Sequence, residues 1–229
     1  MSQAEFDAYV DEYDAQHAQS VRLSGEDPDF FAEYKAKEAA RAMAAAGVHP
    51  RRIMDFGAGR GNCIPHLQRQ FPEAALTALD VSARSLTHCQ ARAIRPLETV
   101  CYDGQTLPFD DASFDLVFTA CVFHHIPEAD HIRLLAEIRR TLSPKGRFIL
   151  FEHNPWNPLT RHAVATCPFD ANAVLISAPE MRRRFRAAGF ADVDLRWTLF
   201  FPGFLAALRP LERGLGWLPL GAQYCLVAR

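Results

Sequence analysis

Three glycines at alternate positions follow a short apolar segment and precede a run with helical spacing. The segment reads Ile53-Met-Asp-Phe-Gly-Ala-Gly-Arg-Gly-Asn62. Glycine has no Cβ, so such a run permits a tight turn and a close approach of a ligand to the backbone. A strand, a glycine turn and a helix N-terminus together form a crevice for a nucleotide-like ligand. The feature therefore favours an α/β fold with a binding site at this turn.

Apolar strand-like segments alternate with helical patterns after residue 52. The predicted strands cover 53–56, 75–79, 98–102, 114–120 and 147–151, and the predicted helices cover 62–71, 82–93 and 127–142. Strands joined by helices form a parallel sheet with right-handed crossovers and helices on both faces. The tail adds a helix over 179–188 and strands over 191–200 and 222–228. We expect a seven-stranded, mostly parallel sheet with an antiparallel edge strand.

Two helix candidates precede the first strand. Residues 5–18 place apolar side chains on one helical face, and a second helix begins at Asp27-Pro28 and ends at Gly47. The acid is expected as its N-cap and the proline at its first position, as Ser82 is expected to cap the helix over 82–93. We expect one domain over 1–229, with cap helices over 1–50, a cofactor-binding core over 51–152, and acceptor-side loops and the last two strands over 153–229.

Length, charge and cysteine usage limit the partners and the compartment. The 229 residues are 49% hydrophobic, enough for a full core, and the net charge of −2 gives no electrostatic reason to expect nucleic acid. The six scattered cysteines form no C-x-x-C pair, which favours free thiols in a reducing compartment. The polar N-terminus is no signal peptide, and the uncharged run 197–208 is too short for a bilayer. We expect a cytoplasmic monomer or homodimer without stable membrane insertion.

Acidic residues follow the second and third predicted strands. Asp80 ends the second strand, where a carboxylate can accept hydrogen bonds from both ribose hydroxyls. Asp103 follows the third strand, where a carboxylate can accept from an exocyclic adenine amine. Asn62 occupies the position that a dinucleotide-binding G-x-G-x-x-G motif gives to its third glycine, so the spacing argues against NAD(P).

The order and spacing of these motifs resemble those of the class I S-adenosylmethionine-dependent methyltransferases. Within that family the pattern is most similar to the type 11/12 group, which includes the ubiquinone and menaquinone methylases. Residues 55–61 match the family's D/E-x-G-x-G-x-G motif, Leu107-Pro-Phe-Asp and Phe114-Asp-Leu-Val its fourth-strand lead-in, and Leu142-Ser-Pro-Lys-Gly-Arg-Phe the turn before its fifth strand. The match covers about residues 50–152. It implies a Rossmann-like fold, S-adenosylmethionine as cofactor and S-adenosylhomocysteine as product. The implied cofactor-binding residues are Asp55, Gly57, Ala58, Gly59, Gly61, Asp80, Val81, Asp103, Gly104, Ala120 and Cys121.

Histidines at the exits of the fourth and fifth strands are candidate catalytic groups. They are His124, His125 and His153. Histidine titrates near neutral pH and can take a proton from an acceptor hydroxyl. The sequence leaves open which of them acts, and whether one packs inward while another caps the following helix. No spacing typical of three metal ligands is present, so we expect no metal.

Aromatic and basic residues outside the core are candidate acceptor contacts. The candidate substrate-binding residues are Tyr9, Tyr13, His17, Trp156 and Arg161. The first three share a helical stripe that could close over the cofactor or simply pack, while Arg161 and Arg209 could bind an acidic acceptor or form ordinary ion pairs. The segment 197–224 is rich in Phe, Leu, Trp and Pro and is expected to form a lid or pocket wall.

These features predict methyl transfer from S-adenosylmethionine to a small molecule by in-line displacement. We expect oxygen as the acceptor atom and His124 or His125 as the base. Three alternatives stay open: methylation of carbon in a quinone-like acceptor, an NAD(P)-dependent oxidoreductase, and a non-catalytic cofactor-binding regulator.

Overall fold

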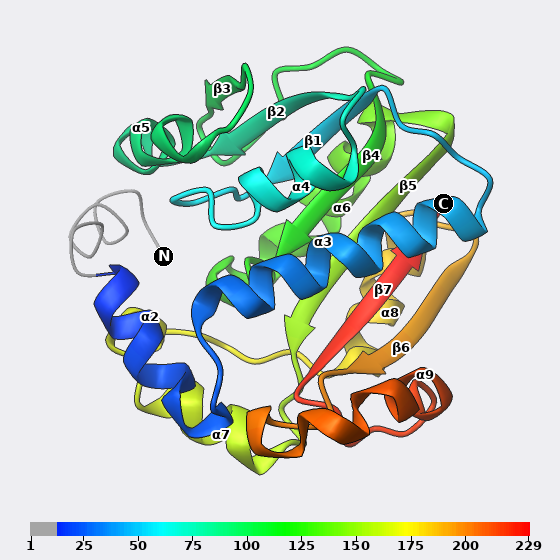
Figure 1. The fold of residues 1–229 in the computed structure, drawn as a ribbon. Helices are drawn as coiled ribbons and strands as arrows, with labels where there is room; N and C mark the ends of the chain where they lie inside the picture. Colours follow the sequence, from blue (N-terminus) through cyan, green and yellow to red (C-terminus); the bar gives the residue numbers. More distant parts are fainter. Residues whose placement is uncertain (1–12) are drawn as a thin grey trace.

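A seven-stranded sheet forms the centre of the computed structural model, which describes residues 13–229 (Figure 1). The strands are β1 (Arg52–Phe56), β2 (Ala75–Asp80), β3 (Glu98–Cys101), β4 (Phe114–Ala120), β5 (Leu142–His153), β6 (Val193–Thr198) and β7 (Gln223–Ala228). Their order is β3-β2-β1-β4-β5-β7-β6. Strands β1 to β5 pair in parallel, and β7 runs antiparallel to both β5 and β6. The predicted seven-stranded, mostly parallel sheet is confirmed, with β6 and β7 as its antiparallel edge pair.

Helices cover both faces of this sheet. On one face, α3 (Pro28–Ala45), α4 (Ile64–Gln70) and α5 (Ala83–Arg92) pack in a core with Ile53 and Phe118. On the other face, α6 (Glu128–Thr141) and α8 (Ala178–Ala187) pack in a core with Met54 and Val117. Successive strand residues enter opposite cores because side chains alternate along a strand.

Shorter helical segments lie beyond the carboxyl ends of β4 and β5 (Figure 1). Among them are α2 (Tyr13–Val21), α7 (Pro158–Ala165) and the consecutive segments η4 (Gly203–Leu211) and α9 (Glu212–Leu215). The connections add the 3-10 turns η1 (Arg22–Ser24), η2 (Phe123–His125) and η3 (Pro168–Asp170). The fold thus places segments that are far apart in the sequence at the carboxyl ends of the parallel strands. This is the edge of the sheet at which open α/β folds bind their ligands.

Local side-chain signals set the starts of two helices. The Asp27 carboxylate accepts a hydrogen bond from the backbone N–H of Phe30 at 2.8 Å, and proline follows at the first helical position of α3. The Ser82 hydroxyl accepts from the N–H of Ser85 at 3.1 Å. Each satisfies a donor that the first helical turn leaves without a partner. Both predicted caps are confirmed.

Strand β5 begins at Leu142, earlier than the predicted start at Arg147. Leu142 pairs with Phe114, but Arg147 already pairs with Leu116, so residues 143–146 bulge out of the ladder. A Cβ on Gly146 would lie 3.0 Å from the Ser143 carbonyl oxygen and 3.1 Å from that of Phe114. Glycine therefore lets the bulge pack against β4, and the predicted turn is a bulge within a longer strand.

Two expectations from composition can be compared with this fold. All six cysteines are free thiols, as predicted. Among the described residues, none of the helices combines the length and apolar character that crossing a bilayer requires.

Candidate active site

A cavity of about 590 Å³ lies at the carboxyl ends of the strands. The glycine loop after β1 and the ends of β2, β4 and β5 line it, and α2, α3 and residues 199–202 add further walls. The volume is within the usual range for nucleotide-sized ligands. The predicted site residues that line it are His17, Asp55, Gly57, Ala58, Gly59, Asp80, Val81, Asp103, Gly104, Ala120, Cys121, His124, His125 and His153.

Two glycines of the loop have different structural roles. Gly59 and Gly61 both have positive φ, 53° and 79°, which side chains disfavour. A Cβ on Gly59 would meet nothing within 4 Å, whereas a Cβ on Gly61 would lie 2.7 Å from the Cys89 Sγ and 2.8 Å from its Cα. Gly61 does not line the cavity; it lets the loop pack against α5. Gly59 leaves its backbone accessible to a ligand.

Two carboxylates stand next to this loop. Asp80 accepts hydrogen bonds from the backbone N–H groups of Gly59 and Ser82, both at 2.8 Å, and so fixes the loop. Asp55, at the end of β1, is buried and accepts no hydrogen bond from any other residue in 13–229. Burial, and secondarily the negative charge of Asp80, raise the pKa of Asp55 to about 8. A cation placed in the cavity would favour its ionised form.

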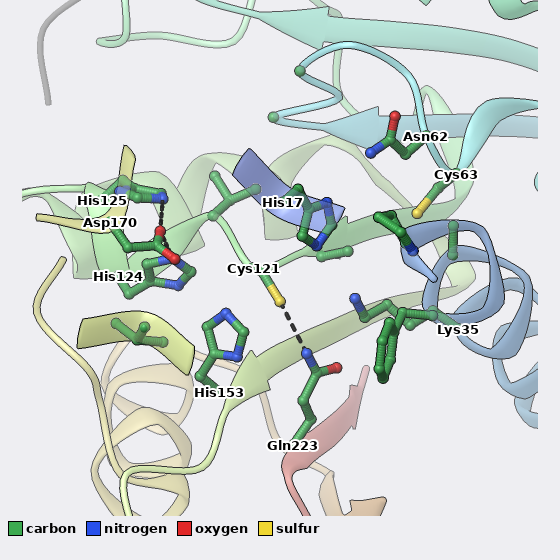
Figure 2. A pocket seen from close by; sticks show the side chains of 18 of the residues that line it. His17, Lys35, Asn62, Cys63, Cys121, His124, His125, His153, Asp170 and Gln223 are labelled. Carbon is green, nitrogen blue, oxygen red and sulfur yellow. Dashed lines mark hydrogen bonds and ion pairs between the residues drawn. The ribbon is translucent and has the colours of Figure 1, made fainter. Parts of the chain in front are cut away.

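The cavity wall also contains a buried cation that the sequence analysis missed. Lys35, on α3, is 8% exposed and forms no ion pair or hydrogen bond with another residue of the described chain. Figure 2 shows its ammonium group directed into the pocket. Burial, with a smaller contribution from Asp55, raises the pKa of the Cys63 thiol to about 12 against the opposing effect of Lys35, so both of these side chains lie near Cys63. Once a ligand cation ionises Asp55, this carboxylate and the Lys35 ammonium would match the ammonium and carboxylate of an amino acid.

Two amide oxygens that line the cavity are buried without a donor among the described residues. Asn62 Oδ1 and Gln223 Oε1 accept no hydrogen bond from the described residues, although the Gln223 amide N–H donates to the Cys121 Sγ at 3.4 Å. Cys121 itself has a φ of 59°, a strained value for a non-glycine residue at the end of β4. Buried acceptors are almost always paired, so these oxygens indicate donors on a bound molecule.

Three histidines and Asp170 lie at the other side of the cavity (Figure 2), and Glu152 joins this cluster from β5 without lining the cavity. His124 Nδ1 donates to Glu152 at 2.7 Å, and its Nε2 lies 3.6 Å from Asp170 Oδ1. His125 Nε2 lies 3.2 Å from the same oxygen. The His153 ring lies 5.0 Å from the His124 ring, measured between centroids. Neither Glu152 nor Asp170 was predicted as a site residue; Asp170 comes from η3, distant in sequence, and no local pattern indicates it.

Burial and charge act in opposite directions within this cluster. Burial disfavours the His124 imidazolium, but Glu152 and Asp170 outweigh it and raise the pKa of His124 to about 10. Burial opposes ionisation of Glu152, yet His124 lowers the pKa of Glu152 to about 2. Burial and then the positive charge of His124 lower the pKa of His153 to about 4, and burial also lowers that of His125. At neutral pH the cluster therefore holds a charged His124 between two ionised carboxylates, Glu152 and Asp170, while His125 and His153 are neutral.

The structure does not bring Trp156 or Arg161 into the cavity. The Asn154 side chain accepts from the Trp156 N–H at 3.1 Å and donates to the Gly221 carbonyl at 2.8 Å, which fixes the loop after β5. Trp156 therefore turns outward, 53% exposed, and stacks on Trp197 with centroids 6.5 Å apart. Arg161 is exposed on α7. The sequence shows a tryptophan near the site but not the hydrogen bonds that turn it away.

The N-terminal stripe is described only in part. Tyr9 lies outside the described residues, and of Tyr13 only the backbone is described. His17 lines the cavity, with its ring edge-on to Phe169 at a centroid distance of 6.1 Å. Helix α2 thus supplies at least one wall residue.

The segment 197–224 is partly wall and partly exposed surface. Phe200 and Phe201 line the cavity. Arg209 also lines it, but its guanidinium pairs with Glu26 and lies 4.4 Å over the Phe30 ring, so it connects the segment to the start of α3. No residue of η4 is buried. Of the two roles that the sequence left open for Arg209, the structure therefore shows the ordinary ion pair.

Comparison with known proteins identifies the family. Residues 54–150 match the model of a methyltransferase domain. The chain is 31% identical over 183 residues to the malonyl-[acyl-carrier protein] O-methyltransferase of Geobacter sulfurreducens, a match that covers 74% of this chain and 67% of the relative. The chain belongs to the class I S-adenosylmethionine-dependent methyltransferases. S-adenosylmethionine is accordingly its cofactor, and the family favours a methyl donor over the nicotinamide alternative.

Two further likenesses extend this result. The demethylmenaquinone methyltransferase of Thermotoga maritima is 34% identical over 110 residues, covering 48% of this chain and 47% of the relative, so the chain spans about half the length of that methyltransferase. A solved methyltransferase of the same organism, described as a possible histamine N-methyltransferase, superposes with a TM-score of 0.68 at 19% identity, covering 98% of this chain and 97% of the other. That likeness shows the Rossmann-like fold. The three proteins are named for three different acceptors.

Proposed function

We propose that the protein methylates an oxygen atom of a small-molecule acceptor, with S-adenosylmethionine bound between the glycine loop and α3. The observation that carries the placement is the pair of buried ionisable side chains, Asp55 and Lys35, which line the cavity and have no partner among residues 13–229. The methionine part of the cofactor carries both an ammonium and a carboxylate. In the proposed site Asp55 pairs with the first and Lys35 with the second.

The adenosine part is assigned to the ends of β2 and β3. Asp80 accepts one backbone N–H on each carboxylate oxygen, and since a carboxylate can accept several hydrogen bonds we assign the ribose hydroxyls to it as well. Asp103 Oδ1 accepts from Gln105 and Thr106 at 2.8 and 3.3 Å, which orients the carboxylate for an adenine amine. A bound sulfonium supplies an activated methyl group, so the chain's own task is alignment and exclusion of water.

The acceptor is assigned to the side of the cavity that holds the histidines. The His153 ring faces the pocket and makes no hydrogen bond with residues 13–229, whereas both ring nitrogens of His124 face carboxylates. Of the three predicted bases, His153 is therefore the one whose geometry suits proton removal from an acceptor oxygen. The rings of Phe30, Phe31, Phe200 and Phe201 line the same cavity and favour an acceptor with an apolar part.

Oxygen as the acceptor atom is supported by the similarity to the O-methyltransferase of Geobacter sulfurreducens. A quinone-like acceptor is the second candidate, because the demethylmenaquinone methyltransferase matches at 34% identity over 110 residues. The two candidates differ in the bond that the methyl group forms.

The test is incubation with S-adenosylmethionine carrying a deuterated methyl group and a panel of hydroxy acids, fatty acids, phenols and quinones. Mass spectrometry detects the labelled product, and its fragmentation locates the methyl group on oxygen or carbon. We expect labelled ether or ester, and loss of most turnover in His153→Asn. His49→Asn is the control, since His49 is exposed and does not line the cavity. Products labelled only on carbon or nitrogen would exclude the oxygen acceptor.

A further inference from the structure

His124, His125 and Asp170 direct three ligand atoms toward one point at the cavity edge. The three atoms all lie within 4.8 Å of one another. The Asp170 oxygen lies 3.6 Å from His124 Nε2 and 3.2 Å from His125 Nε2 (Figure 2). The residues come from η2 and η3, which the fold brings together across more than forty residues of chain. The expectation of no metal rested on sequence spacing and missed this grouping.

These separations suit ligands of one small cation. Nitrogen and oxygen ligands lie about 2.0–2.2 Å from Zn²⁺, so two ligands of a tetrahedral ion are about 3.3 Å apart. The two measured separations from Asp170 bracket that value. Two imidazoles and one carboxylate on one side of an ion leave its other positions open, which is typical of catalytic sites for divalent transition metals.

The surroundings of His124 are those of a supported metal ligand. Its Nδ1 donates to Glu152 at 2.7 Å, which leaves Nε2 directed at the Asp170 oxygen, where a metal ion would replace the Nε2 proton. Glu152 is held in turn by the backbone N–H groups of Val122 and Phe123, at 3.0 and 2.7 Å. A carboxylate on the far nitrogen of a ligating histidine fixes the ring orientation and increases its donor strength.

We propose that His124, His125 and Asp170 bind one divalent transition-metal ion whose open positions face the cavity. The two imidazole ligands favour Zn²⁺, Fe²⁺, Mn²⁺ or Co²⁺ over Mg²⁺ and Ca²⁺, which prefer all-oxygen sites. An acceptor oxygen on this ion would be held beside His153. Metal binding itself depends only on the three ligands and stands apart from the identity of the acceptor.

Co²⁺ is the probe, because its visible absorption reports the ligand set directly. The full-length protein, freed of metal by a chelator, is titrated with Co²⁺ and then with Zn²⁺ as competitor. We expect one equivalent of Co²⁺ to bind and Zn²⁺ to displace it. Asp170→Asn and His125→Gln should each weaken binding by more than about 100-fold, since loss of an outer-shell partner alone costs about 10–100-fold. His49→Asn should bind as the wild type does, because His49 lies away from the cavity.

Folding of each variant is checked by thermal unfolding and by binding of S-adenosylhomocysteine. The two substitutions are independent, so His125→Gln carries the test if Asp170→Asn does not fold. Absence of stoichiometric Co²⁺ binding at millimolar metal, or binding that both substitutions leave unchanged, overturns the proposal. Retained S-adenosylhomocysteine binding in that case would leave the proposed cofactor placement intact, so the two failures are distinguishable.

Discussion

The Asp80 carboxylate, at the end of β2, accepts a hydrogen bond from the backbone N–H of Gly59 at 2.8 Å. One acid therefore fixes the glycine loop of the neighbouring strand while it lines the cavity. The same carboxylate accepts from Ser82 at the start of α5. The glycine loop, Asp80 and the start of α5 form one hydrogen-bonded unit, so a change at Asp80 affects all three.

Asp80→Ala is expected to weaken binding of S-adenosylhomocysteine by at least about tenfold to 100-fold, because hydrogen bonds to a charged group are each worth about 1.5–3 kcal/mol. Calorimetry on purified variants measures the affinity. Asp110→Ala is the matched control, since Asp110 is an exposed acid outside the cavity. Equal affinity in wild type and Asp80→Ala would show that Asp80 serves only as a loop and helix cap.

Lys35→Met should weaken cofactor binding and stabilise the cofactor-free protein at the same time. The ammonium is buried without a partner in the described chain, so its removal should raise the free energy of unfolding by about 1–3 kcal/mol. Chemical denaturation and calorimetry measure the two effects. Lys37→Met, on the same helix, removes an exposed lysine that pairs with Glu33 at 2.8 Å and should change neither quantity much. Weaker stability in Lys35→Met would indicate a partner for this lysine instead.

Cofactor binding should release a proton through Asp55. Its pKa is raised to about 8 by burial and by Asp80, so the carboxyl is mostly protonated in the free protein at pH 7. The cofactor's ammonium favours the ionised form, and affinity should rise by up to about tenfold per pH unit between pH 6 and 8. Calorimetry in buffers of different ionisation enthalpy counts the protons. Asp55→Asn should bind weakly and release none; an unchanged proton count in that variant would refute the assignment.

The same shift predicts how the stability of the cofactor-free protein depends on pH. The folded-state pKa of Asp55 lies above its ordinary value of 3.8. Between about pH 4 and 8 the folded state therefore keeps a proton on Asp55 that the unfolded chain has already lost. The contribution of Asp55 to stability therefore falls as pH rises across this window. Thermal unfolding of Asp55→Asn should show a smaller loss of stability toward pH 8 than the wild type. Parallel curves would contradict the buried, unpartnered state of this carboxyl.

Substitutions at Gly59 and Gly61 should distinguish the role of Gly59 in cofactor binding from the role of Gly61 in packing. Gly61→Ala places a Cβ against Cys89 at a φ of 79° and should cost about 2–4 kcal/mol of stability. Gly59→Ala meets no neighbour and should cost only about 1–2 kcal/mol, yet weaken cofactor binding. Urea denaturation and calorimetry compare the two. Equal stability losses would argue against the packing role of Gly61.

The parts of the site that depend on neighbouring residues could be predicted from the sequence. The glycine loop, the position of Asp80 and the Ser82 cap depend on contacts over a few residues, or on the rule that parallel strands end at one edge. Lys35 could not be predicted, because on a helix rich in charged residues it looks like one more solvated side chain. Its burial follows from the way α3 crosses the sheet (Figure 1).

Asp170 and Trp156 show the same limit at the acceptor side. Asp170 lies within 3.6 Å of His124 and 3.2 Å of His125 only because the fold places η3 next to η2. No local sequence pattern indicates this tertiary contact. Trp156 is an aromatic residue in a loop at the ligand-binding edge of the sheet, so its sequence position predicts a contact with the ligand. The hydrogen bonds of Asn154 turn its side chain outward instead. Residue type at a strand exit therefore indicates the neighbourhood of the site, while long-range hydrogen bonds decide which side chains enter it.

The most direct test of the central claim is calorimetric titration of S-adenosylmethionine into the wild type, Lys35→Met and Asp80→Ala under one set of conditions. The placement between the glycine loop and α3 predicts one molecule bound per wild-type chain, and affinity reduced by at least about tenfold in each variant. Absence of binding to the wild type, or full affinity in both variants, would contradict it.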